Sequence, residues 1–340
     1  MSKTRRKNRP SKTRRKNSPS KTRRKTEKIE EPTNMNCSPV VKKNRVNDET
    51  CFTPEILMDI RKAYNKNHPE KAILDTNAKR VWWELKKRLN CPKEDCWLEQ
   101  LSDDGMKSRI RKHIFAPKKP PEWESNPDEW LSNFDIEDVA KQYEASHPEF
   151  KLITPTTVDF DTRLPEEGGK CVLEELCQFD LARFIKAKKT KIGVVINLDK
   201  HYQGGSHWVS MFIDIENRFI MFFDSADNPI PKEIWKKEKK TKSVITPGGG
   251  GGGRVPLVNR IIAQAKKLNM EFTFYSNRGH SHQNSNSECG MYSLFFIITM
   301  LTGETPFTKG VMSVKARRNM FLKAKIPDKT MFGYRRLYFN

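Results

Sequence analysis

From about residue 50 onward, apolar runs of two kinds alternate with polar, turn-forming segments. Apolar residues at helical spacing predict helices, and short continuous apolar runs predict strands that are buried on both faces. Helices are expected at 54–63, 77–89, 172–186 and 255–268 and directly after residue 289, and extended segments at 150–160, 192–198, 209–213, 218–223 and 270–275. From residue 190 the order is β, β, β, α, β, α. This order predicts an α+β fold with a central, mostly antiparallel sheet packed by helices.

The first 48 residues differ from the rest and are expected to form a disordered tail. Three copies of Ser-Lys-Thr-Arg-Arg-Lys repeat with a period of nine, and none of them contains an apolar residue that could be buried. Residues 1–26 hold 13 of the 64 basic residues and no acidic one, in a chain of net charge +22. Such a tail can bind nucleic acid non-specifically through residues 1–26, act as a nuclear import signal, or keep the chain soluble.

Residues 49–122 are expected to form a small helical domain followed by a proline-rich linker, and residues 123–340 the main domain. Thr53 and Pro54 are an N-cap and a first-turn proline, which mark a helix start. Cys91 and Cys96 could supply half of a zinc site, but no second pair stands at a spacing that completes four ligands. Core or turn cysteines are the favoured interpretation. Six consecutive glycines at 248–253 predict a flexible insertion rather than a phosphate-binding loop.

The seven cysteines and the absence of a secretory signal predict free thiols in a reducing compartment. No apolar run approaches the roughly 18 residues that a membrane span needs, so a soluble protein is expected. Reducing conditions suit a cysteine nucleophile.

Cys289 stands where a polar, turn-prone run ends and a strongly apolar, helix-like run begins. A cysteine there lies at a helix N-terminus, whose unpaired N–H groups and positive dipole end favour the thiolate. Taken alone, such a cysteine is more often structural. A base is also available, because His207 precedes one apolar strand and Asp224 follows the next. If the two strands pair as a hairpin, the carboxylate can orient the imidazole.

The joint pattern of His-Trp before a strand, Asp-Ser 17 residues later, and Gln-x5-Cys-Gly before an apolar helix resembles the SUMO-specific and adenovirus-type cysteine proteases. It is most similar to the polyprotein-processing proteases of large DNA viruses, of the African swine fever virus type. An Ile-x-Asp-x-x-Met-x-x-x-Arg ending is shared with them, and here it comprises Ile326, Asp328, Met331 and Arg335. Some viral relatives carry asparagine at the position of Asp224. The Trp-Leu segment at Trp130 is similar to the opening of SUMO proteases, although Asn133 replaces their aspartate.

The resemblance implies a thiol endopeptidase that needs no metal or organic cofactor. Its implied catalytic residues are Cys289 as nucleophile, His207 as base, Asp224 as orienter and Gln283 as oxyanion donor, with Trp208 and Trp130 binding substrate. Two further histidines, His280 and His282, are expected to be solvated loop residues. The implied substrates are viral precursor proteins, cleaved after Gly-Gly-type sites during virion maturation, in the virion or the host cytoplasm.

Two alternatives stay open. The first is a SUMO or ubiquitin-like deconjugating protease, which uses the same chemistry on a folded partner. The second is a nucleic-acid-binding virion protein whose protease fold is inactive. The basic tail would also allow a nuclear location for any of the three.

Overall fold

The computed structural model describes residues 35–89, 91, 93–237, 255–305 and 308–340. The basic repeats at 2–25 and the glycine run at 248–253 therefore lie outside the described residues. Within these ranges the expected order of elements from residue 190 onward is confirmed, as β4, β5, β6, α7, β7 and α8, and two further helices follow.

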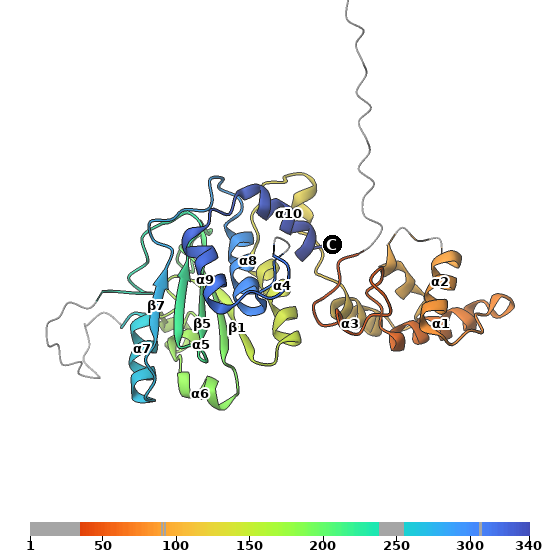
Figure 1. The fold of residues 1–340 in the computed structure, drawn as a ribbon, viewed down its shortest axis with the longest axis horizontal. Helices are drawn as coiled ribbons and strands as arrows, with labels where there is room; N and C mark the ends of the chain where they lie inside the picture. The colour runs from red at the N-terminus through yellow and green to blue at the C-terminus, as the bar shows by residue number, and fades with distance from the viewer. Residues whose placement is uncertain (1–34, 90, 92, 238–254, 306–307) are drawn as a thin grey trace, which may run out of the picture. The chain divides into compact units, whose positions relative to one another are not determined.

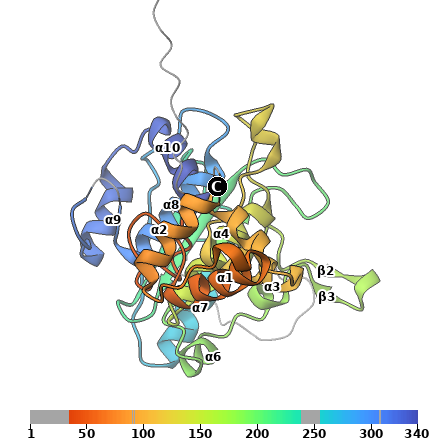
Figure 2. The same ribbon diagram turned by 90° about the vertical axis from the view of Figure 1, so that its right-hand side faces the viewer.

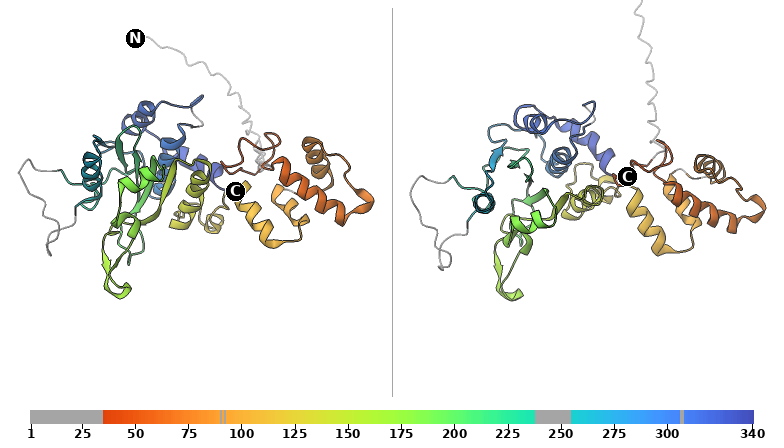
Figure 3. Two further views of the ribbon diagram at one scale, coloured as in Figure 1. Left: turned by 90° about the horizontal axis from the view of Figure 1, so that it is seen from below. Right: turned by 60° about the horizontal axis from the view of Figure 1, so that its bottom comes forward.

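The N-terminal part is helical. Its helices are α1 (Pro54–Asn67), α2 (Ala78–Arg88) and α3 (Asp104–Ile114), joined by 3₁₀ turns at Pro69–Lys71 and Glu94–Gln100. The expected cap is present, because Thr53 accepts from the N–H of Ile56, and the structure adds Asn77 as the cap of α2. Figure 3 shows this part in red to orange, contributing no strand to the main sheet.

The expectation that disorder extends to residue 48 is wrong for residues 35–48. Cys37 pairs with Phe115 as an isolated β-bridge, Ser38 donates its N–H to the carbonyl of Ile114, and Val41 is buried. These contacts join segments almost 80 residues apart, so the local composition of this polar stretch does not reveal them. The division of the chain at 122/123 stays a prediction.

The main sheet has the order β1-β4-β5-β6-β7. The middle pairings, β4–β5 and β5–β6, are antiparallel, whereas the edge pairings, β1–β4 and β6–β7, are parallel. The sheet is thus mixed rather than mostly antiparallel, because helical crossovers bring both edge strands in parallel. The strands are β1 (Phe150–Thr157), β4 (Lys191–Asn197), β5 (Trp208–Asp214), β6 (Phe219–Phe223) and β7 (Thr273–Ser276).

Helices cover both faces of this sheet (Figure 1). On one face lie α4 (Asn133–Ser146), α8 (Cys289–Thr302), α9 (Val314–Lys323) and α10 (Asp328–Tyr338). On the other lie α5 (Glu174–Cys177), α6 (Leu181–Lys186) and α7 (Leu257–Lys267). Alternate residues of each strand face opposite layers, so Val195 joins the α8 side while Val194 and Ile196 join the α7 side.

Gly193 lets α8 approach the sheet closely. A Cβ atom at this position would lie 3.0 Å from a side-chain carbon of Ile297 in α8 and 3.0 Å from the ring of Phe150. The absence of a side chain on β4 therefore fixes how deeply the helix that begins at Cys289 sits in the core.

The single helix expected at 172–186 is instead two short helices, α5 and α6. Asp180 interrupts the run because its side chain caps α6 by accepting from the N–H groups of Ala182 and Arg183. Before α5, the hairpin of β2 (Arg163–Leu164) and β3 (Lys170–Cys171) extends away from the main sheet (Figure 2).

Six of the seven cysteines form disulfides, so the expectation of free thiols holds only for Cys289. The pairs are Cys37–Cys51, Cys91–Cys96 and Cys171–Cys177. All three are local, brought together by turns that cysteine spacing alone does not specify. In the part of the chain that the structure describes, no helix combines the length and the apolar character needed to cross a membrane.

Candidate active site

The β5–β6 hairpin brings His207 and Asp224 together as expected. His207 directly precedes β5 and Asp224 directly follows β6, and the antiparallel register pairs Ser210 with Phe223. His207 Nε2 lies 2.6 Å from Asp224 Oδ1. The carbonyl of His207 also accepts from the N–H of Leu198, which fixes the backbone beside β4.

Cys289 is the first residue of α8, as its position in the sequence predicts, and its thiol interacts with the imidazole of His207, whose pKa it helps to raise. The side chain is almost fully buried. The N–H groups of the first helical turn have no intrahelical acceptor and face an anion favourably. Three residues from distant parts of the sequence therefore form one connected carboxylate–imidazole–thiol series.

The electrostatics of this series favour a charged imidazole. Burial lowers the pKa of His207, but hydrogen bonds to Asp224 and Cys289 and their charges outweigh it and raise the pKa to about 9. Burial would by itself raise the pKa of Asp224, yet the contact with His207 and backbone donors hold that pKa below its usual value. At neutral pH the site thus holds an imidazolium between a carboxylate and the thiol.

Several hydrogen bonds besides that to His207 hold Asp224 in place. Its carboxylate accepts from the N–H of Ala226 at 2.8 Å and of Asn228 at 2.7 Å. Its own N–H donates to Oδ1 of Asn277, whose Nδ2 in turn donates to the carbonyl of Asp224. Asn277 directly follows β7 and is buried. This asparagine was not singled out in the sequence, because nothing local links it to a residue 53 positions away.

Gln283 lies next to Asp224 through Ser225. The hydroxyl of Ser225 donates to Gln283 Oε1 at 2.7 Å, and the carbonyl of Ser225 accepts from the N–H groups of His282 and Gln283. Gln283 Nε2 donates to the carbonyl of Ser285 at 2.7 Å. Because an amide nitrogen carries two hydrogens, one N–H of Gln283 remains for another acceptor. By donating to Oε1, Ser225 fixes the orientation of the Gln283 side-chain amide.

The C-terminal ending holds the loop before the candidate nucleophile. Asp328 accepts from the N–H groups of Asn284 and Ser285 and from the hydroxyl of Tyr292. The guanidinium of Arg335 binds both carboxylate oxygens of Glu288, the residue before Cys289. Asp328 and Arg335 belong to the C-terminal motif found in the sequence, but only the fold shows that they contact the 284–288 loop.

The segment at Trp130 and Leu131 borders the N-terminus of α8. A Cβ atom on Gly290 would lie 3.0 Å from Leu131 Cβ, so the two backbones approach closely. The indole of Trp208 is buried and donates to the carbonyl of Leu131 at 2.9 Å. Of the two tryptophans expected to bind substrate, Trp208 is thus a buried support of this segment, and Trp130, which precedes Leu131, is partly exposed.

The expectation of two solvated loop histidines is wrong for His282. This residue is fully buried, with Nε2 2.9 Å from the carbonyl of Phe321 and Nδ1 accepting from the N–H of Ile326. Burial lowers its pKa to about 4. His280 lies nearer the surface and contacts the carbonyl of Ala324. Both rings are thus engaged with the 321–326 segment.

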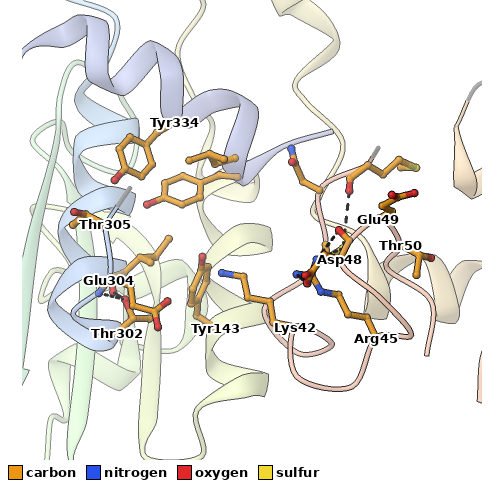
Figure 4. Close-up of a pocket in the computed structure, with 16 residues that line it drawn as sticks. Lys42, Arg45, Asp48, Glu49, Thr50, Tyr143, Thr302, Glu304, Thr305 and Tyr334 are labelled. Atoms are coloured by element: carbon orange, nitrogen blue, oxygen red, sulfur yellow. Dashed lines mark hydrogen bonds and ion pairs between the residues drawn. The ribbon is translucent and has the colours of Figure 1, made fainter. Parts of the chain in front are cut away.

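A pocket of about 450 Å³ lies at the other end of α8, around Thr302 (Figure 4). Its lining includes Lys42 from the segment before α1, Tyr143 from α4 and Tyr334 from α10. Because α8 has 14 residues, this pocket is about 20 Å along the helix from the thiol. It is therefore separate from the candidate active site.

One group of side chains in the described ranges has atoms near enough for a metal ion, namely Cys171, Glu174 and Cys177. Two of the three are joined by a disulfide, and Glu174 already accepts from the N–H of Cys171 at 2.7 Å. These contacts occupy the donor atoms that a metal would need. The group also lies outside the carboxylate–imidazole–thiol series.

Comparison with known proteins identifies related sequences. Residues 182–333 match the family described as "Ulp1 protease family, C-terminal catalytic domain". A protein of Acanthamoeba polyphaga mimivirus that is named as a thiol protease is 28% identical over 278 residues, covering 76% of this chain and 82% of that protein. The cysteine protease of African swine fever virus is 22% identical over 263 residues, covering 74% and 84%. The family match contains His207, Asp224, Gln283 and Cys289.

The fold is also similar to a solved structure. The crystal structure of the African swine fever virus protease superposes with a TM-score of 0.54 at 19% identity, over 91% of this chain and 96% of that one. At this identity the likeness concerns the fold alone. It confirms the α+β fold with a sheet packed by helices that the sequence predicts, although the sheet is mixed rather than mostly antiparallel.

Proposed function

This chain is a cysteine protease with an Ulp1-type domain, and we propose that its catalytic residues are Cys289, His207 and Asp224. The observation that carries this assignment is the series in which Asp224 contacts His207 at 2.6 Å and Cys289 interacts with the same imidazole. Because Asp224 occupies Nε2, Nδ1 is the ring nitrogen that faces Cys289. Asp224 then fixes both the tautomer and the orientation of the base.

The proposed reaction proceeds in two stages. In the reactive form His207 already carries a proton, and the thiolate of Cys289 attacks the scissile carbonyl to form a tetrahedral intermediate. The imidazolium gives this proton to the leaving amine as the C–N bond breaks, which leaves a thioester. A water molecule then gives a proton to His207 as it attacks the thioester. The carboxyl product leaves, and the thiol is regenerated.

Two donors are proposed to stabilise the oxyanion. One is the N–H of Gln283 that Ser285 does not use, in an amide whose oxygen is held by Ser225. The other is the backbone N–H of Cys289 in the first turn of α8. Such preorganised donors act where charge develops and need no reorganisation during the reaction.

The proposed substrates are viral precursor proteins, cleaved after Gly-Gly-type sites during virion maturation in the virion or the host cytoplasm. Support comes from the viral relatives and from the surroundings of the thiol. Leu131 lies directly beside Gly290 and its carbonyl accepts from the indole of Trp208, so a bulky substrate side chain at this place would collide with this segment. A glycine beside the scissile bond avoids the collision, which makes Trp130 and Trp208 substrate-binding residues.

A deconjugating activity is the second candidate. A related African swine fever virus protein, 22% identical over 261 residues, is named as a SUMO-1 cysteine protease. The chemistry at Cys289 would be the same, but the product would be a released modifier. The two candidates therefore differ only in the partner that presents the glycine.

The test is cleavage of viral precursors and of a SUMO conjugate by the full chain, with cleavage sites identified by mass spectrometry. We expect cuts after Gly-Gly in precursors, none with Cys289→Ala, and labelling of Cys289 by a glycine-vinyl probe. Release of the modifier with intact precursors would favour the deconjugase. A folded wild-type protein that resists the probe would contradict the catalytic assignment.

A further inference from the structure

The exposed face of α2 is centred on a tryptophan. Val81, Trp82 and Leu85 form the buried face of this helix, whereas Trp83 is 57% exposed. Its indole is braced from one side, since the ring of Trp82 meets it edge-on at 5.0 Å and Lys86 Nζ lies 5.2 Å from its centroid. A large aromatic surface is therefore held in a fixed place and left open to solvent.

Four basic residues surround Trp83 on the same face. Lys79 and Arg80 stand four and three residues before it, and Lys86 and Lys87 three and four residues after it. Residues at these spacings are neighbours on a helix surface. All four are exposed. Together they place cations on both sides of the indole along about 12 Å of helix.

The positive charge of this face is only partly balanced. The helix contains five basic residues and one acidic one. Arg80 contacts Asp75 and Lys86 contacts Glu49, both at 3.4 Å, and Arg88 pairs with Glu84 at 2.7 Å. All three pairs are at least partly exposed, so they contribute little to stability and are screened by salt. Lys79 and Lys87 have no carboxylate partner among the described residues.

A pocket of about 350 Å³ adjoins the indole. Its apolar wall is formed by Trp83 and by Leu74, which is 87% exposed, and its rim by the ion pairs Arg80–Asp75 and Arg88–Glu84. Two large apolar side chains are thus exposed beside charged groups, which favours an interaction site over a merely solvated helix.

We propose that this surface binds single-stranded nucleic acid, with Trp83 stacked on an unpaired base and the flanking lysines on the phosphates. Alternating cations around a fixed indole match the charge and the planar groups of such a strand. A duplex fits less well, because its bases are already stacked on one another. An acidic peptide would satisfy the lysines but supplies no planar partner for the indole. The site is independent of the basic tail, since residues 1–34 contain no aromatic residue.

The test compares two labelled 12-mers of equal charge, an oligothymidylate and its abasic counterpart, binding to the full chain at a fixed high salt concentration. A tail that binds phosphates alone would not distinguish the two strands, whereas stacking on Trp83 would. We expect the oligothymidylate to bind about 10-fold more tightly. Trp83→Leu should remove this preference while leaving abasic binding unchanged, and Trp83→Phe should keep most of it.

A matched control is Phe134→Leu. Phe134 is an exposed aromatic on α4, but Glu137 and Asp138 follow it at helical spacing, so its surface repels phosphates. This variant should retain the preference for bases. The double variant Lys79→Gln/Lys87→Gln should weaken the binding of both 12-mers equally. The proposal is overturned if the wild-type chain binds both 12-mers equally, or if folded Trp83→Leu, with normal peptide cleavage, still prefers bases. Loss of binding to oligoglutamate alone in Trp83→Leu would instead assign the surface to an acidic protein.

Discussion

Glu288, the residue before the candidate nucleophile, forms a two-point ion pair with Arg335 of α10. Arg335 Nε lies 3.1 Å from one carboxylate oxygen, and a terminal nitrogen binds the other. Both side chains are buried. Burial raises the pKa of Glu288, and the charge of Arg335 opposes this. The guanidinium also packs 4.2 Å from the ring of Trp123. The start of α8 is thereby joined to the C-terminal helix.

Removal of Arg335 should destabilise the protein strongly. Arg335→Leu leaves a buried carboxylate without its partner, for which we expect a loss of about 3–5 kcal/mol in the free energy of unfolding, measured in urea. Adding Glu288→Gln should recover part of this loss, because the uncompensated charge disappears. Arg80→Leu, which breaks an exposed pair with Asp75, should cost less than about 1 kcal/mol. Equal losses in both arginine variants would show that the buried pair is not an anchor.

The alkaline limb of the pH–rate profile should report His207. This residue must be protonated to give a proton to the leaving amine, and its pKa is raised to about 9. Activity should therefore fall as the pH rises through about 9. Asp224→Ala removes a hydrogen bond and a charge that raise this pKa, so the limb should move to lower pH in measurements of kcat/KM.

Asp224→Asn should have a milder effect, because an amide oxygen can still orient the imidazole. An unchanged alkaline limb in Asp224→Ala would mean that another group controls it. The carboxylate would then have a structural role only.

Gln283→Ala should lower kcat about 10²–10³-fold with KM little changed, as expected for the loss of one oxyanion donor. Ser225→Ala should lower kcat less, because the amide remains but its orientation is no longer fixed through Oε1. Asn286→Ala, an exposed residue of the same loop, serves as the control and should retain full activity. A fully active Gln283→Ala enzyme would remove glutamine from the mechanism.

Stability should fall as the pH drops from about 6.5 to about 4, because His282 is neutral when folded. Its pKa is lowered by burial to about 4, so the unfolded chain binds a proton that the folded chain excludes. Over this whole pH range the free energy of unfolding should fall by about 3 kcal/mol. His207 does not add to this change. Because its pKa is raised, the stability that it contributes is lost only as the pH rises from about 6.5 toward 9.

Urea unfolding at several pH values measures this effect. In His282→Gln the slope between pH 6.5 and 5 should shrink, although the variant is less stable overall. The same slope in both proteins would assign the pH dependence to carboxylates.

The basic tail should dominate non-specific binding to duplex DNA. Replacing the 13 Lys and Arg residues of 1–26 by glutamine should remove most of the affinity and most of its salt dependence, which is about −0.9 in log K per phosphate neutralised. Cleavage of a short Gly-Gly peptide should be unchanged. Equal affinity of both proteins at two salt concentrations would leave the tail as an import or solubilising segment.

The sequence by itself determined the features that depend on local patterns. Cys289 could be placed at a helix N-terminus because a polar run changes to an apolar run at that residue. His207 and Asp224 could be brought together because two adjacent apolar strands with a short connection form a hairpin. The cap at Thr53 is likewise a property of a few neighbouring residues.

The tertiary structure alone decided which distant groups meet. The spacing of apolar residues in the sequence predicts which face of an element is buried, but not which residues that face contacts. It therefore does not predict the hydrogen bonds between Asn277 and Asp224 or the ion pair between Glu288 and Arg335. For the same reason the sequence did not predict that the edge strands pair in parallel, or that residues 35–48 are ordered by distant contacts. His282 stands in a polar segment that composition assigns to solvent, yet it is buried because α9 and the segment that follows it, including Ile326, cover this loop and satisfy both ring nitrogens.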